Sequence, residues 1–327
     1  MIGFCLAAGA GTRLLPLTRT VPKPLLAPAG RPLVDLAVEA LRASGATRVV
    51  VNAHHGADQL AARLAGRPGV EVVVEPVLLG TGGGLVNAAR LGLLGDGDDP
   101  VLVTAADHVV DPADLADLAA LLDQAGAPMA VGLVPGAADP YRLRLEGAEG
   151  RVVRDPGGRW ESAGVYGLRA GRLCDLEPGP ATLFGRVLGP LLAEGQVAGL
   201  PFRGPMADAG TLHRLLGVSA GLLTGRWPYT LPPGELRRGL GGGLVFVAEG
   251  AHVDPAAVLA GPVVLDAGSR VGAGAVVTRA VVGPDAQVGP RARVVGSFLG
   301  PQAQVPADAA IAAALVPASE RPTRPPR

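Results

Sequence analysis

The sequence has few cysteines and no long hydrophobic run, and each shortage argues against a class of protein. The two cysteines, Cys5 and Cys174, lie far apart and in no spacing typical of metal ligands. This argues against a disulfide scaffold and a cysteine-based zinc site, and favours a reducing cytoplasm. No apolar run reaches the roughly 18 residues that a membrane span needs. The apolar N-terminus lacks the positive start of a signal peptide, so we predict a buried strand there.

The chain also lacks a charge excess. It has 29 basic and 29 acidic residues, which argues against nucleic acid or an anionic membrane as a partner bound by bulk charge. All basic residues but one are arginine, and the single lysine is Lys23. A compact ammonium and a planar guanidinium are not interchangeable. Lys23 is therefore a candidate functional residue.

The 327 residues suggest about two domains, at roughly 150 residues each. In the first two-thirds, apolar strand patterns alternate with helical ones, which predicts a Rossmann-like α/β domain with a mostly parallel sheet. Ligands bind at the carboxyl ends of such strands. The expected strands cover 2–7, 48–53, 70–76 and 100–107, and the expected helices cover 32–44, 56–65, 83–93, 112–124, 181–193 and 211–223.

A repeat occupies the C-terminal part. Aliphatic residues recur every six positions from Val253 to Val277, and the phase slips by one before Val282 and again before Leu299. This period is typical of a parallel β-helix, although short strands of a β-sandwich are an alternative. We expect an α/β domain over 1–224, a Gly/Pro-rich linker over 225–245, a left-handed β-helix over 246–315 and a disordered tail over 316–327.

The loop after the first strand has the chemistry of an anion site. Gly9 and Gly11 allow close approach of the backbone, whose N–H groups can form an anion nest. Arg13 can bind a phosphate with two N–H groups, and Lys23 can reach the same anion. Leu14 stands where a dinucleotide-binding fingerprint has its third glycine, which disfavours a Rossmann oxidoreductase.

This segment resembles the signature of the sugar-1-phosphate nucleotidylyltransferases, a G-x-G-T-R loop followed by P-K-P. The resemblance implies that a sugar 1-phosphate oxygen attacks the α-phosphate of an NTP and releases pyrophosphate. It implies that Arg13 and Lys23 contact the triphosphate, and that Ala8 lies in the nucleotide site with the loop. The matching signature residues are Gly9, Gly11, Thr12, Arg13, Pro22, Lys23 and Pro24.

A second match covers residues 78–91. Family members carry a similar Gly-Thr loop against the nucleobase, which makes Gly82 and Gly83 candidate base contacts. A simple turn into a helix is the alternative. The triple glycine looks most like that of heptose- and mannose-1-phosphate guanylyltransferases and of muramate-1-phosphate uridylyltransferases.

Two carboxylates match the metal ligands of the family. Asp107 follows a buried strand, where Ala105 and Ala106 replace the usual Asn-Gly, and Asp208 stands in an Asp-x-Gly-Thr segment. The resemblance implies that both hold one Mg²⁺ between the NTP and the sugar phosphate. For Asp208, a turn or capping role is the alternative. Asp111 precedes Pro112 and a helix, so we predict that it is a helix N-cap.

The expected sugar site departs from the family pattern. The lysine of the family's Glu-Lys-Pro motif is absent, so we expect an arginine to bind the sugar phosphate. The candidates are Arg154, Arg159 and Arg203. For each of them, a solvated surface residue without a role in binding is the alternative. The family's tyrosine, glutamate and small turn residues correspond to Tyr141, Glu161, Ala163 and Gly164.

These observations favour a nucleotidylyltransferase that uses GTP with a mannose- or heptose-type 1-phosphate. UTP- or dTTP-dependent transfer to a sugar or cyclitol phosphate is an alternative. A non-catalytic homologue that binds an NDP-sugar is another, and a second, acyl-transfer activity of the β-helix is the least favoured. Related guanylyltransferases with such a tail imply that the β-helix serves homo-oligomerisation or an allosteric contact, and we expect a homo-oligomer.

Overall fold

The computed structural model describes residues 1–95, 97–136, 142–147 and 150–318, so most of the expected tail lies outside the described residues. The chain divides into two compact units. Unit 1 comprises Met1–Ala10 and Val34–Ala207, and unit 2 comprises Gly11–Leu33 and the chain from Asp208 onward. The predicted anion-binding loop therefore belongs mostly to the unit that contains the C-terminal repeat.

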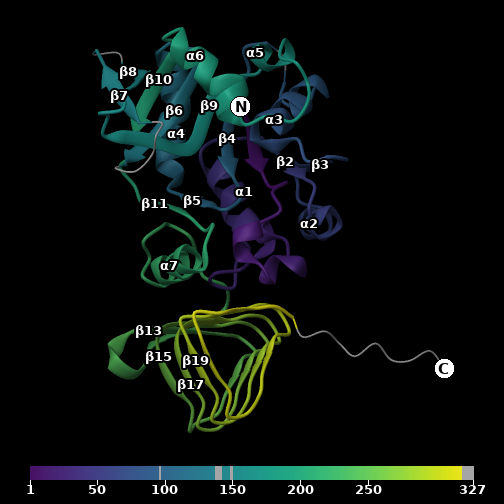
Figure 1. The fold of residues 1–327 in the computed structure, drawn as a ribbon, viewed down its shortest axis with the longest axis vertical. Coiled ribbons are helices and arrows are strands. Elements are labelled where there is room, and N and C mark those ends of the chain that lie inside the picture. Colours follow the sequence, from purple (N-terminus) through teal and green to yellow (C-terminus); the bar gives the residue numbers. More distant parts are fainter. Residues whose placement is uncertain (96, 137–141, 148–149, 319–327) are drawn as a thin grey trace, which may run out of the picture. The chain divides into compact units, whose positions relative to one another are not determined.

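Unit 1 is built on a nine-stranded sheet in the order β3-β2-β1-β4-β9-β6-β10-β8-β7 (Figure 1). The first four strands of this order pair in parallel, which confirms the predicted parallel arrangement. Strand β9 runs antiparallel to both β4 and β6, so the sheet as a whole is mixed. The bounds are β1 Ile2–Leu6, β2 Arg48–Ala53, β3 Val70–Val74, β4 Pro100–Ala105, β6 Met129–Pro135, β7 Leu143–Glu146, β8 Arg151–Arg154, β9 Trp160–Arg169 and β10 Val197–Pro201. A small sheet pairs β5 (His108–Val110) with β11 (Met206–Asp208).

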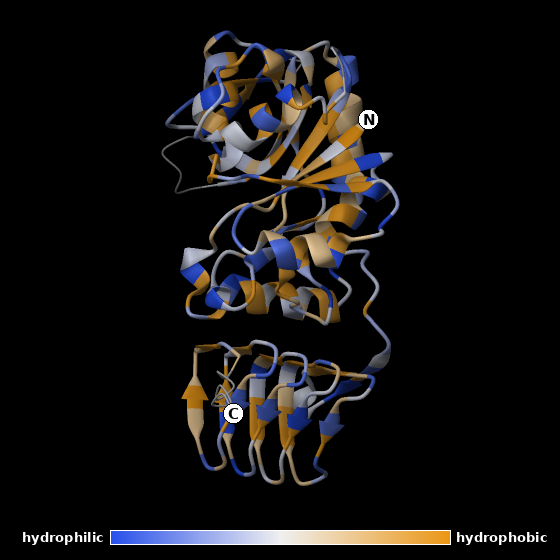
Figure 2. Cartoon of the chain, turned by 90° about the vertical axis from the view of Figure 1, so that its right-hand side faces the viewer, coloured by the Kyte–Doolittle hydropathy of each residue, from blue (hydrophilic) through white to orange (hydrophobic). Residues whose placement is uncertain are grey.

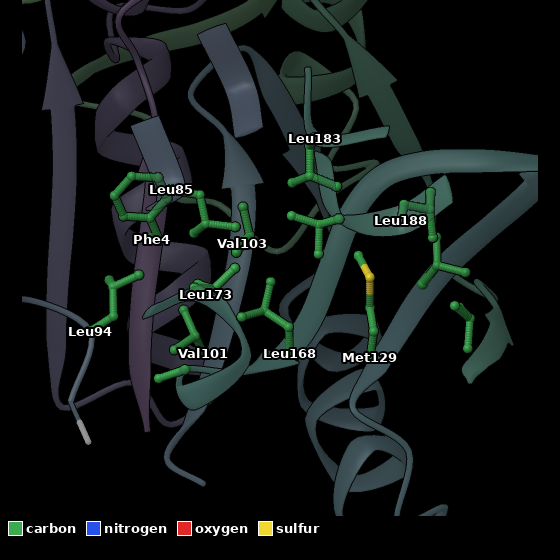
Figure 3. Close-up of a cluster of buried hydrophobic side chains, with 14 of the residues drawn as sticks. Phe4, Leu85, Leu94, Val101, Val103, Met129, Leu168, Leu173, Leu183 and Leu188 are labelled. Atoms are coloured by element: carbon green, nitrogen blue, oxygen red, sulfur yellow. The ribbon is translucent and has the colours of Figure 1, made fainter. Parts of the chain in front are cut away.

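Helices cover both faces of this sheet. On one face, the strand residues Phe4, Val101 and Val103 belong to a cluster of buried side chains (Figure 3). The helical residues Leu85 and Leu188 belong to the same cluster. The opposite face contacts other helices: a Cβ on Gly3 would touch Leu41, and one on Gly167 would touch Leu122. The strands of the sheet are mostly hydrophobic, as expected of strands buried on both faces (Figure 2). The helices are α1 Leu33–Ala43, α2 Ala57–Leu64, α3 Gly80–Arg90, α4 Pro112–Gln124, α5 Gly171–Cys174 and α6 Gly189–Ala193.

The C-terminal part of unit 2 is a parallel β-helix, as predicted (Figure 1). Its coils stack in register: Val277 pairs with Val294, and Val294 with Ile311, 17 residues further on each time. The aliphatic residues at the repeat positions form its buried interior. The strands are β13 Leu244–Ala248, β14 His252–Val253, β15 Val258–Leu265, β16 Arg270–Val271, β17 Val276–Val282, β18 Gln287–Val288, β19 Arg293–Val295, β20 Phe298–Leu299, β21 Gln304–Val305, β22 Ala310–Ala312 and β23 Leu315–Val316.

The segment 225–245, expected as a linker, contains a further strand. Strand β12 (Gly234–Arg238) pairs antiparallel with β13 and so adds an edge to the first coil. Among the described residues, no helix is both long and apolar enough to cross a membrane.

One face of the β-helix is apolar on its outside as well as its inside. Phe246, Val264, Val281 and Phe298 pair with one another across four coils and alternate with interior residues, so they point outward, yet each is at most 2% exposed. Helix α7 (Leu212–Leu223) contacts the strands of this face. This amphipathic helix therefore shields part of the hydrophobic surface from water.

The segment Gly11–Leu33 also lies on the β-helix. Leu17 fills the space above Gly300, and Gly30 approaches both Asp266 and Pro232 so closely that a Cβ would lie 2.8 Å from each. Arg31 donates a hydrogen bond to the carbonyl of Thr230 at 3.1 Å. Through these contacts the loop and the repeat form one compact unit.

Asp266 makes this contact sensitive to pH. Its side chain is 2% exposed, one carboxyl oxygen has no hydrogen-bond partner among the described residues, and burial raises its pKa from 3.8 to about 7. The folded protein therefore holds a proton that the unfolded chain has lost between pH 4 and 7. We predict that the free energy of unfolding falls by up to about 4 kcal/mol as pH rises through this window.

Denaturant unfolding at several pH values tests this prediction. Asp266→Asn should remove most of this pH dependence and raise the free energy of unfolding above pH 7. Asp285→Asn, at an exposed corner of the same β-helix, should leave the pH dependence unchanged. An equal slope in wild type and Asp266→Asn would contradict the prediction.

Candidate active site

A buried polar network ties together the carboxyl ends of β1, β2 and β3. The backbone N–H of Ala7 donates to Asn52 Oδ1 at 2.7 Å, and Asn52 Nδ2 donates to Glu75 Oε1 at 2.7 Å. Glu75 Oε2 accepts the N–H of Leu79 at 3.1 Å. Asn52 and Glu75 are each 1% exposed. The network therefore fixes the loop that follows β1 against the loop that leads into α3.

Sequence reasoning missed this network. Its signal was a polar residue, Asn52, directly after three valines of a strand, and an acidic residue, Glu75, at the end of another strand. Next to the network, Ala8 is buried, whereas Gly9 is exposed, and a Cβ there would meet none of the described residues within 4 Å. The backbone at Gly9 is open to a ligand.

The glycines of the second motif lie in helix α3, which begins at Gly80, three residues before the predicted start. A Cβ on Gly82 would lie 2.5 Å from the carbonyl oxygen of Thr182, and one on Gly83 would lie 2.4 Å from that of Gly179. Both N–H groups donate to the carbonyl of Ala181. Packing against residues 179–182 thus accounts for both glycines, and their contact with a base stays a prediction.

Asp107 lies half-buried between β4 and β5, at the edge of the sheet where the parallel strands end. The preceding Ala106 donates its N–H to the carbonyl of Leu6 at 2.9 Å, which places the turn beside the end of β1. Burial raises the pKa of the Cys5 thiol well above its usual range, and the Asp107 carboxylate raises it further. Cys5 is therefore an inert thiol of the core.

Two other acidic residues of this region have structural roles. Asp111 accepts the N–H of Ala113 at 3.0 Å, which confirms the predicted N-cap of α4. Asp114, 4% exposed, accepts the N–H groups of Arg203 and Gly204 at 3.0 and 2.9 Å. Asp114 therefore anchors the turn that leads into β11.

The expected sugar-site residues come from two different strands. Glu161 and Ala163 lie on β9, half-buried and buried, and Arg154 is exposed at the end of β8. Gly164 has a φ of +69°, and a Cβ there would lie 2.4 Å from the imidazole of His108, the residue after Asp107. A close contact thus links β9 with the Asp107 turn. Tyr141 lies outside the described residues.

In unit 2, the signature loop folds back on itself. Gly11 has a φ of +63°, and a Cβ there would lie 2.9 Å from Thr18 and 3.1 Å from Cβ of Lys23. The Thr18 hydroxyl donates to the carbonyl of Gly11 at 3.1 Å. Only glycine suits this left-handed, crowded position. The short helical turns Thr12–Leu14 and Lys23–Leu25 are thereby brought together, with Lys23 beside the glycine loop.

The structure brings Arg13 and Asp208 to the same point. A Cβ on Gly210 would lie 2.6 Å from Asp208 Oδ1 and 2.7 Å from a guanidinium nitrogen of Arg13. Arg214, on α7, donates to Asp208 Oδ2 at 2.5 Å. Sequence reasoning missed Arg214, whose only signal is its position six residues after Asp208.

Asp208 fits a metal ligand. Its Oδ1 is buried and accepts no hydrogen bond from the part of the chain that the structure describes, so one oxygen remains for a cation. Within the same residues there is no group of three or more His, Cys, Asp or Glu suited to a metal. Mg²⁺ does not need one, because it is typically held by one or two carboxylates with phosphate and water oxygens.

Comparison with known proteins gives the family. Residues 2–141 match the model of the nucleotidyl transferase family. The chain is 31% identical to a mannose-1-phosphate guanylyltransferase of Mycobacterium tuberculosis over 296 residues, which is 85% of this chain and 78% of that protein. It is 38% identical to an N-acetylmuramate α-1-phosphate uridylyltransferase of Caulobacter vibrioides over 149 residues, 43% of this chain and 54% of that protein.

A solved structure supports the fold. It is described as a glucose-1-phosphate thymidylyltransferase of Bacillus anthracis in complex with sucrose, and superposes with a TM-score of 0.58 at 18% identity. The match covers 67% of this chain and 94% of that one.

The chain belongs to the nucleotidyl transferase family. Within it, the protein is a sugar-1-phosphate nucleotidylyltransferase, which confirms the resemblance of the signature loop. Enzymes of this family generally use divalent metal ions.

The contact between Gly30 and Asp266 generates a prediction for the signature loop. Gly30→Ala combines a left-handed backbone (φ +71°) with a clash against Asp266 and Pro232, whereas Gly225→Ala has a similar φ of +68° and open space around it. We predict that Gly225→Ala costs about 1 kcal/mol of stability and leaves kcat/KM unchanged. Gly30→Ala should cost more and lower kcat/KM at least about tenfold, because it displaces the segment that carries Lys23. Equal kcat/KM values for the two variants would contradict this view.

Proposed function

We propose that the protein transfers a guanylyl group from GTP to a mannose- or heptose-type sugar 1-phosphate. The main observation behind the proposed reacting centre is that the side chains of Arg13 and Asp208 lie together beside Gly210. The likeness to a guanylyltransferase over 85% of the chain supports GTP and mannose 1-phosphate. Transfer of a uridylyl group is the second candidate, supported by the 38% identity to a uridylyltransferase over the N-terminal part.

In this reaction an oxygen of the sugar phosphate attacks the α-phosphorus of the NTP. The bond from that phosphorus to the oxygen bridging to the β-phosphate breaks, and pyrophosphate leaves with the electron pair. Arg13 and Lys23 would bind the triphosphate oxygens and stabilise the charge that gathers on the leaving pyrophosphate. Catalysis then consists mainly of positioning and charge neutralisation, and the transfer needs no covalent nucleophile.

We assign the metal to Asp107 and Asp208. The buried Oδ1 of Asp208, which has no hydrogen-bond partner among the described residues, supports this assignment. A bound Mg²⁺ would neutralise charge at the reacting phosphate. Arg214 would hold the other oxygen of Asp208 and so orient the carboxylate.

The remaining contacts follow the signature. Ala8, Gly9, Gly11 and Thr12 would present backbone N–H groups to the phosphates, and Gly82 and Gly83 would lie near the base. Glu161, Ala163 and Gly164 would line the sugar site, with Arg154 at its phosphate. Self-association through the β-helix is part of the same proposal.

A substrate panel tests this function. Pyrophosphate release is measured with each of five NTPs and Mg²⁺, against mannose 1-phosphate, a heptose 1-phosphate and N-acetylmuramate 1-phosphate separately. The proposal expects the highest kcat/KM with GTP and one of the first two acceptors. Preference for UTP with N-acetylmuramate 1-phosphate would establish the second candidate instead. Tight NDP-sugar binding without turnover would indicate a non-catalytic homologue.

Carboxylate variants test the metal assignment. Asp107→Asn and Asp208→Asn should each lower kcat at least about 100-fold at saturating NTP, because each removes charge that holds the metal. Asp111→Asn is the matched control: asparagine caps a helix as well as aspartate does, so its activity should stay within about twofold of wild type. Full activity of Asp208→Asn, with fold confirmed by circular dichroism, would refute the assignment.

A further inference from the structure

A cavity of about 580 Å³ lies within unit 2, between α7 and one corner row of the β-helix. This volume is typical of sites for small organic ligands. Its walls are apolar: Leu212, Leu216 and Ala220 come from α7, and Pro262, Ala280 and Val281 come from successive coils. The reaction proposed above uses none of these residues.

The cavity also has a polar side that carries one permanent cation, the guanidinium of Arg279. Arg279 and His213 line it, and both are exposed. Neither makes an ion pair or a side-chain hydrogen bond with any residue that the structure describes. The equivalent corners of the next two coils hold Gly296 and Ala313, whose small side chains leave the guanidinium of Arg279 accessible beside the cavity.

A guanidinium binds planar or tetrahedral anions, such as carboxylate, sulfonate or phosphate, through two N–H groups. An apolar wall with one free cation at its side therefore suits a molecule with an apolar body and a single anionic group. A strongly polar ligand such as a free nucleotide would leave many of its polar groups unpaired against these walls.

The cavity is connected to the Asp208 segment through α7. Thr211 lines the cavity and caps this helix, its hydroxyl accepting the N–H of Arg214 at 3.4 Å. The side chain of Arg214 in turn donates to Asp208. A ligand that packs against the first turn of α7 thus acts on the residue that orients Asp208.

We propose that this cavity is a regulatory site for an organic anion with an apolar body, and that its occupancy changes catalysis through Arg214 and Asp208. The binding part holds whichever nucleotide the enzyme uses. The regulatory part rests on the proposed role of Asp208.

Anilinonaphthalene sulfonate, an aromatic body with one sulfonate, is the probe. The full-length protein should bind it saturably with one site per chain, measured by fluorescence titration. Arg279→Gln should weaken binding about tenfold, since a charge-assisted hydrogen bond is lost. A glutamine is compatible with the left-handed backbone of Arg279, because Gln302 occupies another corner of the β-helix with a φ of +58°. The uncharged phenylnaphthylamine should bind wild type and Arg279→Gln equally, within about twofold.

Two further variants keep the test specific. Gly217 lines the cavity on α7, and a Cβ there would have no atom of the described chain within 4 Å. Gly217→Phe should fill the cavity without disturbing the fold and weaken both probes at least about tenfold. Arg293→Gln removes an exposed arginine from another face of the same β-helix and should change neither affinity. Absence of saturable binding, or equal effects of Arg279→Gln and Arg293→Gln, would overturn the site.

The regulatory part is tested by initial rates of pyrophosphate release. A saturating concentration of the sulfonate should change kcat/KM of wild type by about fivefold or more, a typical coupling between sites. It should leave Gly217→Phe unaffected. If the sulfonate binds tightly but kcat/KM does not change, the cavity is a binding site and the proposed regulation is disproved. Failure of Asp208→Asn to lower activity would instead disprove the role of Asp208, so the two failures are distinguishable.

Discussion

The arrangement of unit 2 depends on the need to cover one outward face of the β-helix. A β-helix buries a single interior stripe on each strand, and its outer side chains usually face water. Here Phe246, Val264, Val281 and Phe298 form a second apolar row on the outside of four successive coils, and all are buried. At about 25 cal/mol for each Å² of apolar surface, exposing four such side chains would cost several kcal/mol. Helix α7 contacts this face, and the segment Gly11–Leu33 packs on the same β-helix through Leu17 and Gly30.

This packing has a functional consequence. Arg13 and Lys23 lie on the segment Gly11–Leu33, and Asp208 lies just before α7. These three residues of the proposed triphosphate and metal sites are therefore positioned by elements that pack on the β-helix. If the proposed site is right, the β-helix supports the side of it that Arg13, Lys23 and Asp208 form. In unit 1, the buried Asn52–Glu75 network has the corresponding task, because it fixes the loop after β1.

Local patterns predicted the parts of the structure that local chemistry determines. The parallel strands, the repeat interior and the N-cap at Asp111 follow from apolar periodicity and from the preference of aspartate before a helix. The Asn52–Glu75 network, the His108–Gly164 contact and the Arg214–Asp208 pair were not predicted, because each joins residues through tertiary packing that no short pattern encodes. The start of α3 was misplaced for a similar reason. A run of glycines reads as a loop, but here it is helical, with backbone from residues 179–182 occupying the space of the missing side chains.

Hydrogen exchange in the native state tests most directly whether the β-helix supports the signature segment. The N–H of Leu33 is hydrogen-bonded to Leu26 at 3.0 Å, and that of Val281 to Ser297 at 3.0 Å within the coils. Exchange is followed at increasing denaturant concentration, so that each amide reports the free energy of the unit that opens. We predict that the opening free energies of the amides in residues 11–33 converge with those of the β-helix, so that both segments open in one transition. Two results would contradict this prediction. The amides of residues 11–33 could open together with those of β1 and β4, or they could exchange freely while the β-helix stays protected.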